Sequence, residues 1–339
     1  MSRRAGGQTL ALRPAAVVRG WSSVAGPMEG AGPLGERFDE VTPDDRLGER
    51  SVERAERRYM RRAVDLLLEK TGVEAGDVDV FLAGDLLDQL VTSSFTAREL
   101  GLPYVGMYGA CATSALLLGT GAALVSAGLV RRVIVATASH HLAAERQYRF
   151  PVELGVQRAP AAQWTATGGA AFLLEADGDG PRLTHFTLGR VQDMGLKDPG
   201  NMGGAMAPAA AHTLTAHFAD SGRAPGDYDL ILTGDLARVG HPLARKVLEE
   251  DGIELGERFE DAGILLYRED QDVHAGGSGT ACSALVTAAT LLPDLGAGRL
   301  RRALMVATGS LHSPTTYQQG ESIPVIAHAV ALEAAGHGK

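Results

Sequence analysis

The sequence predicts an α/β fold made of two similar halves, with five layers in the order α-β-α-β-α. Short apolar runs that read as buried strands alternate with helical segments, which is typical of sheets covered on both faces. The same order of segments occurs twice along the chain. In each copy one helix has no polar face, so it must be buried on every side. Two such helices fit between two sheets.

The repeat is clearest in two pairs of segments. Val78–Asp85 (VDVFLAGD) resembles Tyr228–Asp235 (YDLILTGD), and each reads as a buried strand with a break at glycine. Gly109–Ser139 and Gly279–Ser310 both run from a cysteine through a small-residue helix and an Arg-Arg pair to a strand that contains Val-Ala-Thr and ends in serine. Agreement over so many features indicates a duplication.

We expect the N-terminal half to cover residues 1–187 and the C-terminal half residues 188–339. Within the first half, residues 1–50 are expected to form an irregular arm, because Gly20–Gly48 is rich in glycine and proline.

The remaining elements follow from local patterns. Ser51–Lys70 reads as an amphipathic helix with Ser51 as its N-cap. Gly168–Glu175 reads as a strand. Arg158–Thr167 and Pro199–Pro208 read as loops.

Composition excludes several classes of protein. The chain has 339 residues, of which 45% are hydrophobic, and its net charge is −9. Such a charge argues against nucleic-acid binding, which needs a basic surface. Two cysteines do not make a disulfide framework. We find no signal peptide and no apolar run long enough for a transmembrane helix, so any membrane association is expected to be peripheral.

Cys111 is the first candidate for a functional site. It follows Gly109-Ala110 and opens a long buried helix. Backbone N–H groups at a helix start can hold an anion, and the same position is expected to lower the pKa of the thiol. Cys282 stands at the equivalent place of the second copy, where packing in the core is the favoured interpretation.

Further candidates lie at strand ends and glycine breaks, where clefts form in such sheets. Asp85 and Asp235 end equivalent strands, and each either caps the next helix or lies at the floor of a cleft. His140 follows one predicted strand end, and His274 precedes the glycine cluster that contains Gly277. Ser310 ends the second Val-Ala-Thr strand. We predict that Cys111, Asp85, His140, His274, Gly277 and Ser310 bind a ligand, with no metal, cofactor or catalytic residue.

Two basic residues, Arg146 and Arg149, are a weaker candidate for meeting carboxylates, since guanidinium groups pair with them bidentately. The glycine cluster itself lacks the lysine of a phosphate-binding loop and the spacing of a dinucleotide fingerprint.

The duplicated pattern, with a cysteine opening the first buried helix, resembles the thiolase superfamily. A closer resemblance is to the stage V sporulation protein AD family. It rests on these segments: Ala25–Gly35, Phe81–Gln89, Gly106–Ser114, Ala136–Pro151, Gly195–Thr213, Tyr228–Leu236, Ala275–Ala284 and Val306–Val330.

The resemblance implies a thiolase-like fold with two βαβαβαββ halves, and a homodimer. It also implies binding of dipicolinic acid (pyridine-2,6-dicarboxylate), with or without calcium, and a part in its uptake into the developing spore. The partners would be other proteins of the sporulation stage V A operon, several of them membrane-embedded. The protein would then lie on the cytoplasmic side, peripherally at the spore inner membrane.

One departure from the thiolase pattern favours binding over catalysis. Thiolases and ketoacyl synthases carry a histidine in the second half, but the strand end here reads Thr233-Gly234-Asp235. Gly240-His241-Pro242 falls outside the glycine turn to which the thiolase triplet belongs. Without a base, acyl transfer loses much of its rate. Two alternatives stay open: an active acyltransferase that uses Cys111, and a structural partner in a membrane complex.

Overall fold

The structure is a computed structural model, and it describes residues 3–148 and 158–336. Its strands form two half-sheets with the same order. Across the first half-sheet lie β2 (Thr9–Ala25), β8 (Gly168–Glu175), β6 (Arg132–Ser139), β4 (Val80–Asp85) and β5 (Tyr104–Gly106). Across the second lie β9 (Arg182–Thr187), β14 (Val325–Glu333), β13 (Arg302–Ser310), β10 (Leu230–Thr233) and β11 (Phe259–Asp261).

Strand directions repeat as well as strand order. In each half the two outermost pairs are parallel, β6 with β4 and β4 with β5, or β13 with β10 and β10 with β11. The two inner pairs are antiparallel. β2 and β9 also pair antiparallel and join the two half-sheets. The predicted duplication is therefore visible in the topology, while the predicted boundary at residue 187 stays a prediction because β9 bonds to strands of both halves.

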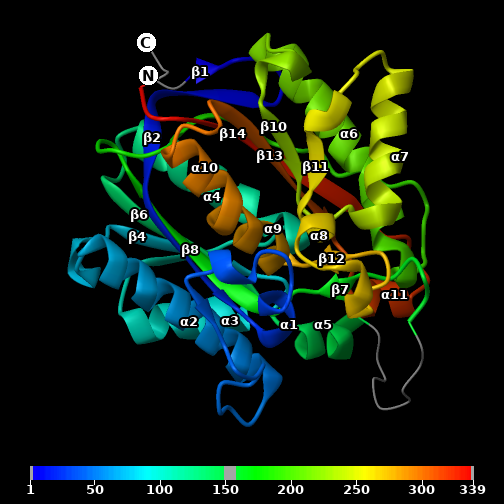
Figure 1. The fold of residues 1–339 in the computed structure, drawn as a ribbon, viewed down its shortest axis with the longest axis horizontal. Helices are drawn as coiled ribbons and strands as arrows, with labels where there is room; N and C mark the ends of the chain where they lie inside the picture. The colour runs from blue at the N-terminus through cyan, green and yellow to red at the C-terminus, as the bar shows by residue number, and fades with distance from the viewer. Residues whose placement is uncertain (1–2, 149–157, 337–339) are drawn as a thin grey trace.

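The helices complete the five predicted layers (Figure 1). Between the half-sheets lie α4 (Thr113–Ser126) and the helical run of α9 (Thr280–Val286), a π-turn (Thr287–Leu291) and α10 (Leu292–Gly296). Helices α2 (Val52–Thr71) and α3 (Val91–Leu100) cover the outside of the first half-sheet, and α6 (Met202–Ser221) and α7 (Ala237–Glu250) cover the second.

Short elements join these layers. The short helices are α1 (Pro27–Gly30), α5 (His141–Tyr148), α8 (Ala262–Leu265) and α11 (Pro314–Gln318). Single 3-10 turns occupy Gly35–Arg37, Ala75–Asp77, Ala110–Ala112, Pro199–Asn201, Pro225–Asp227, Gly256–Arg258 and Glu269–Gln271. Strands β1 (Arg3–Arg4) and β3 (Glu40–Val41) pair with β2, whereas β7 (Trp164–Thr165) and β12 (Gly277–Ser278) form a separate parallel pair.

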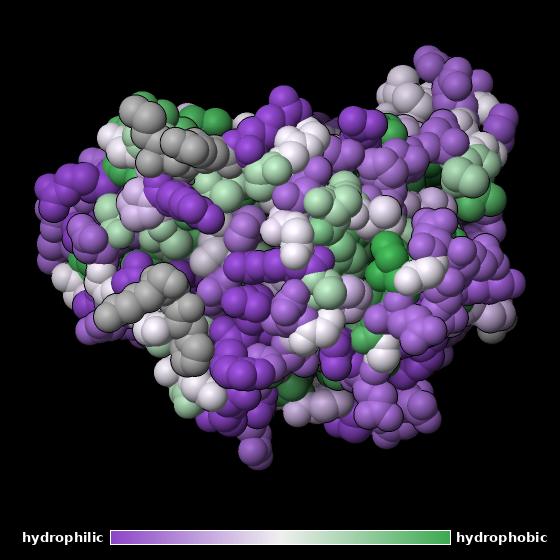
Figure 2. All heavy atoms as spheres, turned by 90° about the horizontal axis from the view of Figure 1, so that it is seen from above, coloured by the Kyte–Doolittle hydropathy of each residue, from purple (hydrophilic) through white to green (hydrophobic). Residues whose placement is uncertain are grey.

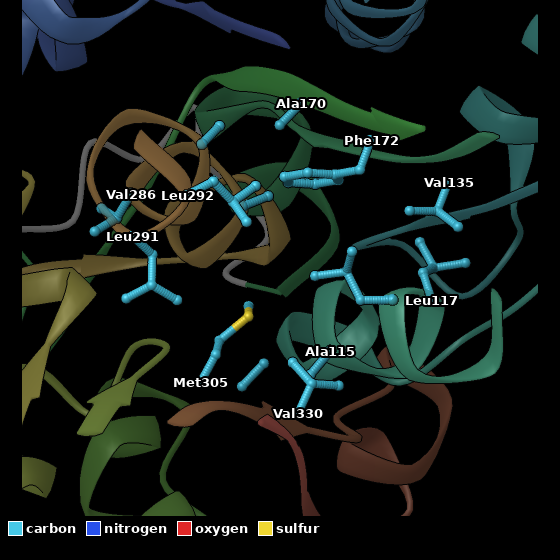
Figure 3. Close-up of a cluster of buried hydrophobic side chains, with 14 of the residues drawn as sticks. Ala115, Leu117, Val135, Ala170, Phe172, Val286, Leu291, Leu292, Met305 and Val330 are labelled. Carbon is cyan, nitrogen blue, oxygen red and sulfur yellow. The ribbon is translucent and has the colours of Figure 1, made fainter. Parts of the chain in front are cut away.

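The main core lies in the central layer (Figure 3). Leu117 of α4 packs among buried side chains of both half-sheets, including Phe172 of β8 and Met305 of β13. All three are at most 2% exposed. Each fully buried side chain of this size stabilises the fold by roughly 1.5–3 kcal/mol through removal of apolar surface from water. This packing explains why α4 has no polar face.

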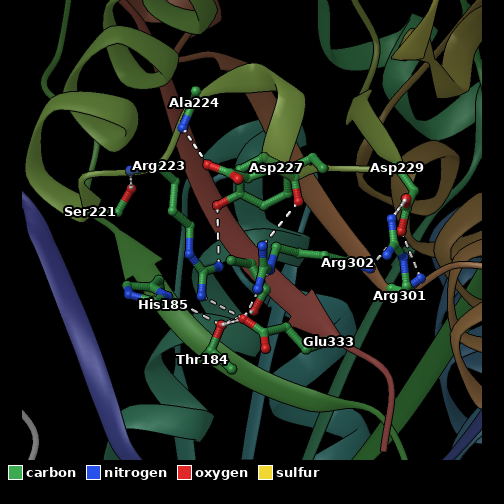
Figure 4. Close-up of polar contacts among 12 residues, drawn as sticks. Thr184, His185, Ser221, Arg223, Ala224, Asp227, Asp229, Arg301, Arg302 and Glu333 are labelled. Carbon is green, nitrogen blue, oxygen red and sulfur yellow. Dashed lines mark hydrogen bonds and ion pairs between the residues drawn. The ribbon is translucent and has the colours of Figure 1, made fainter. Parts of the chain in front are cut away.

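Side-chain contacts also repeat between the halves. In the second half, Asp229 accepts hydrogen bonds from the backbone N–H groups of Arg301 and Arg302, and Arg302 pairs with Glu333 at 3.3 Å (Figure 4). In the first half the corresponding contacts are made by Asp79, Arg131, Arg132 and Glu175. The second half adds Arg223, whose Nη2 lies 2.5 Å from Glu333 Oε1.

The structure confirms one predicted element and differs from three others. The predicted helix at Ser51–Lys70 is confirmed as α2, and Ser51 caps it by accepting a hydrogen bond from the N–H of Arg54 at 3.3 Å. The predicted irregular arm is wrong for residues 9–25, which form the central strand β2. Its proline and glycine lie at or beside two register shifts, between Ala11 and Ala16 and between Val18 and Gly20, where a strand tolerates them.

The predicted loop at Pro199–Pro208 is also wrong beyond residue 201, because α6 begins at Met202. Its glycines serve close packing of two helices. A Cβ on Gly203 would lie 2.5 Å from the carbonyl oxygen of Leu236, and one on Gly240 would lie 2.1 Å from that of Gly203. The predicted loop at Arg158–Thr167 contains the two-residue strand β7.

The surface seen in Figure 2 is mostly hydrophilic, with small separate hydrophobic areas. Within residues 3–148 and 158–336, no helix combines the length and the apolar composition that crossing a bilayer requires.

Candidate functional site

Cys111 lies in a small cavity where the two halves meet. It belongs to the 3-10 turn Ala110–Ala112 at the start of α4 and is 6% exposed. The wall of the cavity brings together segments distant in the chain. It includes Leu86, Ala144 and Tyr148 from the first half, Thr165 before β8, and Met202, Ser278 and Ser310 from the second half. The cavity volume, ≈ 20 Å³, is about the room that one water molecule needs.

A chain of hydrogen bonds links the thiol to a buried carboxylate. Cys111 Sγ lies 3.7 Å from Ser278 Oγ, and Ser278 Oγ donates to Asp235 Oδ2 at 2.9 Å. The same carboxylate accepts from the N–H of Gly279 at 3.2 Å and from the Thr308 hydroxyl at 2.6 Å. Asp235 is therefore fixed by several donors, and it places a carboxyl group next to the thiol.

These surroundings keep the Cys111 thiol neutral. Burial raises its pKa well above the ordinary value, and the nearby Asp235 carboxylate raises the pKa further. The expectation that the helix start lowers this pKa is wrong, because removal of the thiolate from water and repulsion by Asp235 outweigh the helix dipole. A neutral thiol is a weak nucleophile.

Ser310 and Tyr148 add polar groups to the wall. Ser310 is 4% exposed, and in the described part of the chain its hydroxyl has no hydrogen-bond partner. The Tyr148 hydroxyl donates to the carbonyl oxygen of Leu86 at 2.9 Å, and its ring lies 5.5 Å from that of His312. The cavity therefore presents a thiol and hydroxyl groups on a largely apolar wall.

Comparison with known proteins identifies the family. The model of the family named Stage V sporulation protein AD matches residues 6–333. A protein of that name from Bacillus subtilis (strain 168) is 45% identical over 331 residues, which cover 98% of both chains. The chain belongs to the stage V sporulation protein AD family. A role in stage V of sporulation follows from this membership, and the resemblance found in the sequence is confirmed.

Solved structures confirm the thiolase-like fold of this family member. The 3-oxoacyl-[acyl-carrier-protein] synthase III of Aquifex aeolicus VF5 matches with a TM-score of 0.58 at 14% identity, covering 94% of this chain and 99% of that one. A single-residue variant of OleA from Xanthomonas campestris matches with a TM-score of 0.59 at 14% identity, covering 94% and 98%. At such identity the likeness concerns the fold alone.

The structure does not place Asp85 on the cavity wall. Its carboxylate accepts from the N–H groups of Thr92 at 2.7 Å and Ser93 at 2.8 Å, at the start of α3. It thus acts as a helix cap, which was the simpler of the two interpretations. Burial raises the pKa of Asp85 to about 6.

His140 and His274 also lie away from the cavity wall. His140 is fully buried, its Nε2 lies 2.9 Å from the Asp45 carbonyl oxygen, and its Nδ1 accepts from the N–H of Leu142. Both ring nitrogens are therefore engaged with the backbone, and burial lowers the pKa of the ring. His274 bonds through Nδ1 to the Ala159 carbonyl oxygen at 2.8 Å.

Gly277 lies behind the wall. Its carbonyl oxygen accepts from Gln163 Nε2 at 3.2 Å, and a Cβ there would lie 3.1 Å from Cys282 Sγ. Cys282 itself is fully buried in the core, as its favoured interpretation proposed. Of the predicted ligand-binding residues, the structure thus brings only Cys111 and Ser310 together in the cavity, and their binding role stays a prediction.

Sequence reasoning missed the contribution of Ser278 and Tyr148. Ser278 was visible only as part of a glycine-rich turn, and no signal in the sequence pairs it with Asp235. Arg146 is paired with Glu53 at 2.9 Å, and Arg149 lies outside the described residues. No group of three or more histidine, cysteine, aspartate or glutamate side chains in residues 3–148 and 158–336 could hold a metal ion.

Proposed function

We propose that the Cys111 cavity binds dipicolinic acid and that this binding supports its uptake into the developing spore. Membership of a stage V sporulation family supports the setting. The observation that carries the proposal is the neutral thiol beside Ser278 and Asp235, in a cavity with hydroxyl groups and apolar walls. Such a site suits recognition of a ligand better than attack on one.

Catalysis is disfavoured by the electrostatics of the same residues. A cysteine nucleophile is activated by a partner that stabilises the thiolate, such as a protonated histidine. Here the hydrogen-bonded chain ends in a carboxylate, which opposes a negative charge on sulfur. The described cavity wall includes no histidine. We therefore propose that the protein binds its ligand without chemical change.

The charge of the wall favours the calcium chelate over the free dianion. The described wall contains no lysine or arginine, and it does contain Glu145. A dianion would lose its hydration there without gaining an ion pair. A chelate with calcium has no net charge and can use hydroxyl contacts from Ser278 and Ser310. Because the cavity has room for about one water molecule, binding also requires side chains of the wall, such as Tyr148 and Met202, to move.

Calorimetric titration with dipicolinate, with and without calcium, tests the proposal. We expect saturable binding that is tighter with calcium. Cys111→Trp should abolish it by filling the cavity, whereas Cys111→Ala should retain it, since a ligand site needs no nucleophile. Circular dichroism verifies that both variants fold. Absence of binding to the folded wild type, or equal binding by Cys111→Trp, contradicts the proposal.

A second candidate is acyl transfer with Cys111 as the nucleophile. It is favoured by the position of Cys111 at the start of the buried helix α4, in a fold shared with 3-oxoacyl-[acyl-carrier-protein] synthase III. Incubation with an acyl-CoA followed by peptide mass mapping decides it. Acylated Cys111 would support the enzyme, and an unmodified thiol after prolonged incubation would exclude it.

We further propose that the protein works as a homodimer with other proteins of the sporulation stage V A operon, peripherally at the spore inner membrane. The first half-sheet ends at the edge strand β5, where Val105 is 49% exposed. Helix α3, which contacts β5, also exposes Val91 and Phe95. An exposed edge strand with apolar side chains supports pairing with a second chain.

A further inference from the structure

A separate hollow lies on the outside of the first half, where α2 packs against α3 (Figure 1). Its volume is ≈ 480 Å³, within the usual range for small-ligand sites. The wall consists of residues from these two helices, namely Glu53, Arg54, Arg57, Val91, Phe95 and Arg98. We call it the α2–α3 hollow. None of the residues assigned above to ligand binding lines it.

The wall of this hollow carries more positive charge than its carboxylates balance. Although the whole chain has a net charge of −9, three arginines line the hollow with one glutamate. That glutamate, Glu53, is already paired with Arg146 at 2.9 Å. Arg57 meets Glu99 with 3.4 Å between Nε and Oε1, but Nε has no hydrogen-bond partner in the described part of the chain. Four arginines against two glutamates thus leave two positive charges in excess.

Two of these guanidinium groups have donors that the chain itself does not use. Arg54 and Arg98 are exposed, and within residues 3–148 and 158–336 their side chains form no hydrogen bond or ion pair. The Cζ of Arg98 lies 4.4 Å from the centre of the Phe95 ring, and that of Arg57 lies 5.5 Å from it. Stacking holds a guanidinium by its flat face and leaves the N–H groups at its edge available. The hollow therefore presents positively charged donors with too few acceptors.

The chemistry of these donors defines the ligand. Guanidinium groups bind phosphate and carboxylate oxygens through two parallel N–H groups. A phosphate group carries up to two negative charges, which matches the excess on the wall, whereas a single carboxylate would neutralise only half of it. Val91 and Phe95 are 46% and 39% exposed beside the arginines, so an apolar body attached to the phosphate also finds contacts.

We propose that the α2–α3 hollow binds a phosphate-bearing ligand, with Arg54 and Arg98 as hydrogen-bond donors and Arg57 as a third positive charge. A lipid headgroup and a soluble phosphate compound share this chemistry. The donors lie on α2 and α3, apart from the Cys111 cavity and from the strand β5 through which two chains are proposed to pair. The site is therefore independent of the proposed function and can be tested without dipicolinate.

Calorimetric titration with inorganic pyrophosphate tests the site at physiological ionic strength, where weak attraction between exposed charges is screened. We expect saturable binding by the wild type. Arg54→Gln and Arg98→Gln each remove one charged donor from an exposed helix position, and each should weaken the binding about ten-fold. Arg190→Gln is the matched control, because Arg190 is exposed, forms no ion pair within the described residues and lies outside the hollow. Absence of saturable binding to the folded wild type, or equal weakening by Arg190→Gln, overturns the proposal.

Vesicle sedimentation then distinguishes the two sources of phosphate. Vesicles of phosphatidylglycerol and phosphatidylcholine in equal parts are compared with vesicles of phosphatidylcholine alone. Sedimentation of the wild type with the mixed vesicles, lost in Arg54→Gln and kept in Arg190→Gln, assigns the hollow to a lipid headgroup. Pyrophosphate binding without sedimentation assigns it to a soluble phosphate compound. Sedimentation that all three proteins share equally places the membrane contact elsewhere and likewise leaves the hollow to a soluble compound.

Discussion

At the scale of single residues, the chemistry of Cys111 is decided by what surrounds the sulfur. The helix start behind it would favour a thiolate, but burial and Asp235 act in the opposite direction and are stronger. Ser278 bridges the two groups, with its hydroxyl 3.7 Å from the thiol and 2.9 Å from the carboxylate. A helix start favours a reactive thiolate, while burial and the neighbouring carboxylate favour a neutral thiol.

Asp235→Asn should make Cys111 more reactive. The substitution removes the negative charge that opposes the thiolate, so the pKa of the thiol falls. Each unit of decrease raises the thiolate fraction about ten-fold while the thiol is mostly protonated. The alkylation rate of Cys111 by iodoacetamide, followed by peptide mass mapping, measures the effect. Asp177→Asn, which removes an exposed carboxylate that does not line the cavity, is the control. An unchanged alkylation rate in Asp235→Asn would show that the charge of Asp235 does not affect the pKa of the Cys111 thiol.

Glu29 should make the stability of the protein depend on pH. Burial raises its pKa to about 7, from an ordinary value of 4.5 in the unfolded chain. Folding therefore favours the protonated form, so this contribution to stability is complete below pH 4.5 and is lost as the pH rises through 7. The loss is about 3 kcal/mol by linkage.

Urea unfolding of the wild type and Glu29→Gln measures this contribution, at several pH values from below 4.5 to above 7. The variant cannot ionise at this position, so the difference in unfolding free energy between the two proteins should shift by about 3 kcal/mol in favour of the variant on going to alkaline pH. A difference that is independent of pH would mean that Glu29 ionises normally in the folded protein.

Single candidate residues could be predicted from the sequence more readily than the residues that contact them. Cys111 was chosen from its place before a buried helix, and Ser310 from its place at the end of a repeated strand. Both patterns can be read along the chain. The hydrogen bond between Ser278 and Asp235 joins residues on different elements, so it could be found only from the three-dimensional fold. His140 follows a strand end as predicted, yet the backbone around Asp45 engages its ring.

At the scale of secondary-structure elements, Asp85 illustrates how a strand end positions the helix that follows. Its carboxylate accepts hydrogen bonds from two backbone N–H groups at the start of α3. Burial raises the pKa of the neighbouring Glu56, and repulsion by Asp85 raises it further. The strand β4 and the helix α3 are thus joined by one side chain.

Asp85→Ala should destabilise the protein by about 1–2 kcal/mol through loss of this cap. Asp85→Asn should cost less, because it keeps an acceptor and removes the charge beside Glu56. Urea unfolding measures both. If Asp85 acts only as a cap, Asp85→Asn also leaves dipicolinate affinity unchanged, whereas a clear loss of affinity in this folded variant would restore Asp85 to the ligand site.

Elements with a regular pattern were predictable, whereas β2 and α6, each with a proline inside it, were not. The amphipathic pattern and cap of α2 identified it within one residue of its observed bounds. In contrast, β2 contains Pro14 and Gly20, and α6 contains Gly203 and Pro208. Register shifts accommodate Pro14 and Gly20, and the close approach of α6 to α7 accounts for Gly203. Both are tertiary features that no local pattern reports.

At the scale of the whole molecule, the duplication determines where the cavity forms. Each half supplies a buried helix, α4 or α9, to the central layer, and Ser114 of one bonds to Ser283 of the other at 2.7 Å. Cys111 comes from the first half and Ser278 from the second, so the cavity exists only when both halves are packed together. Repetition in the sequence was therefore the strongest predictor of the fold.

Val105→Lys should convert the proposed homodimer into a monomer. Val105 lies on the edge strand β5, and a lysine there opposes pairing of two edge strands. Light scattering coupled to size exclusion gives the mass. Leu129→Lys is the matched control, because Leu129 is 71% exposed and lies in the connection between α4 and β6, not on an edge strand. A wild type of monomer mass, or a dimeric Val105→Lys variant, contradicts the proposed interface.

The most direct test of the central claim, that the ligand occupies the cavity at Cys111, is protection of that thiol. The protein is labelled with methyl methanethiosulfonate in the presence of increasing amounts of calcium dipicolinate. Peptide mass mapping then gives the labelling rate of Cys111. The account predicts that the rate falls in proportion to the bound fraction measured by calorimetry. Saturable binding with an unchanged rate at Cys111 would place the ligand elsewhere and contradict the account.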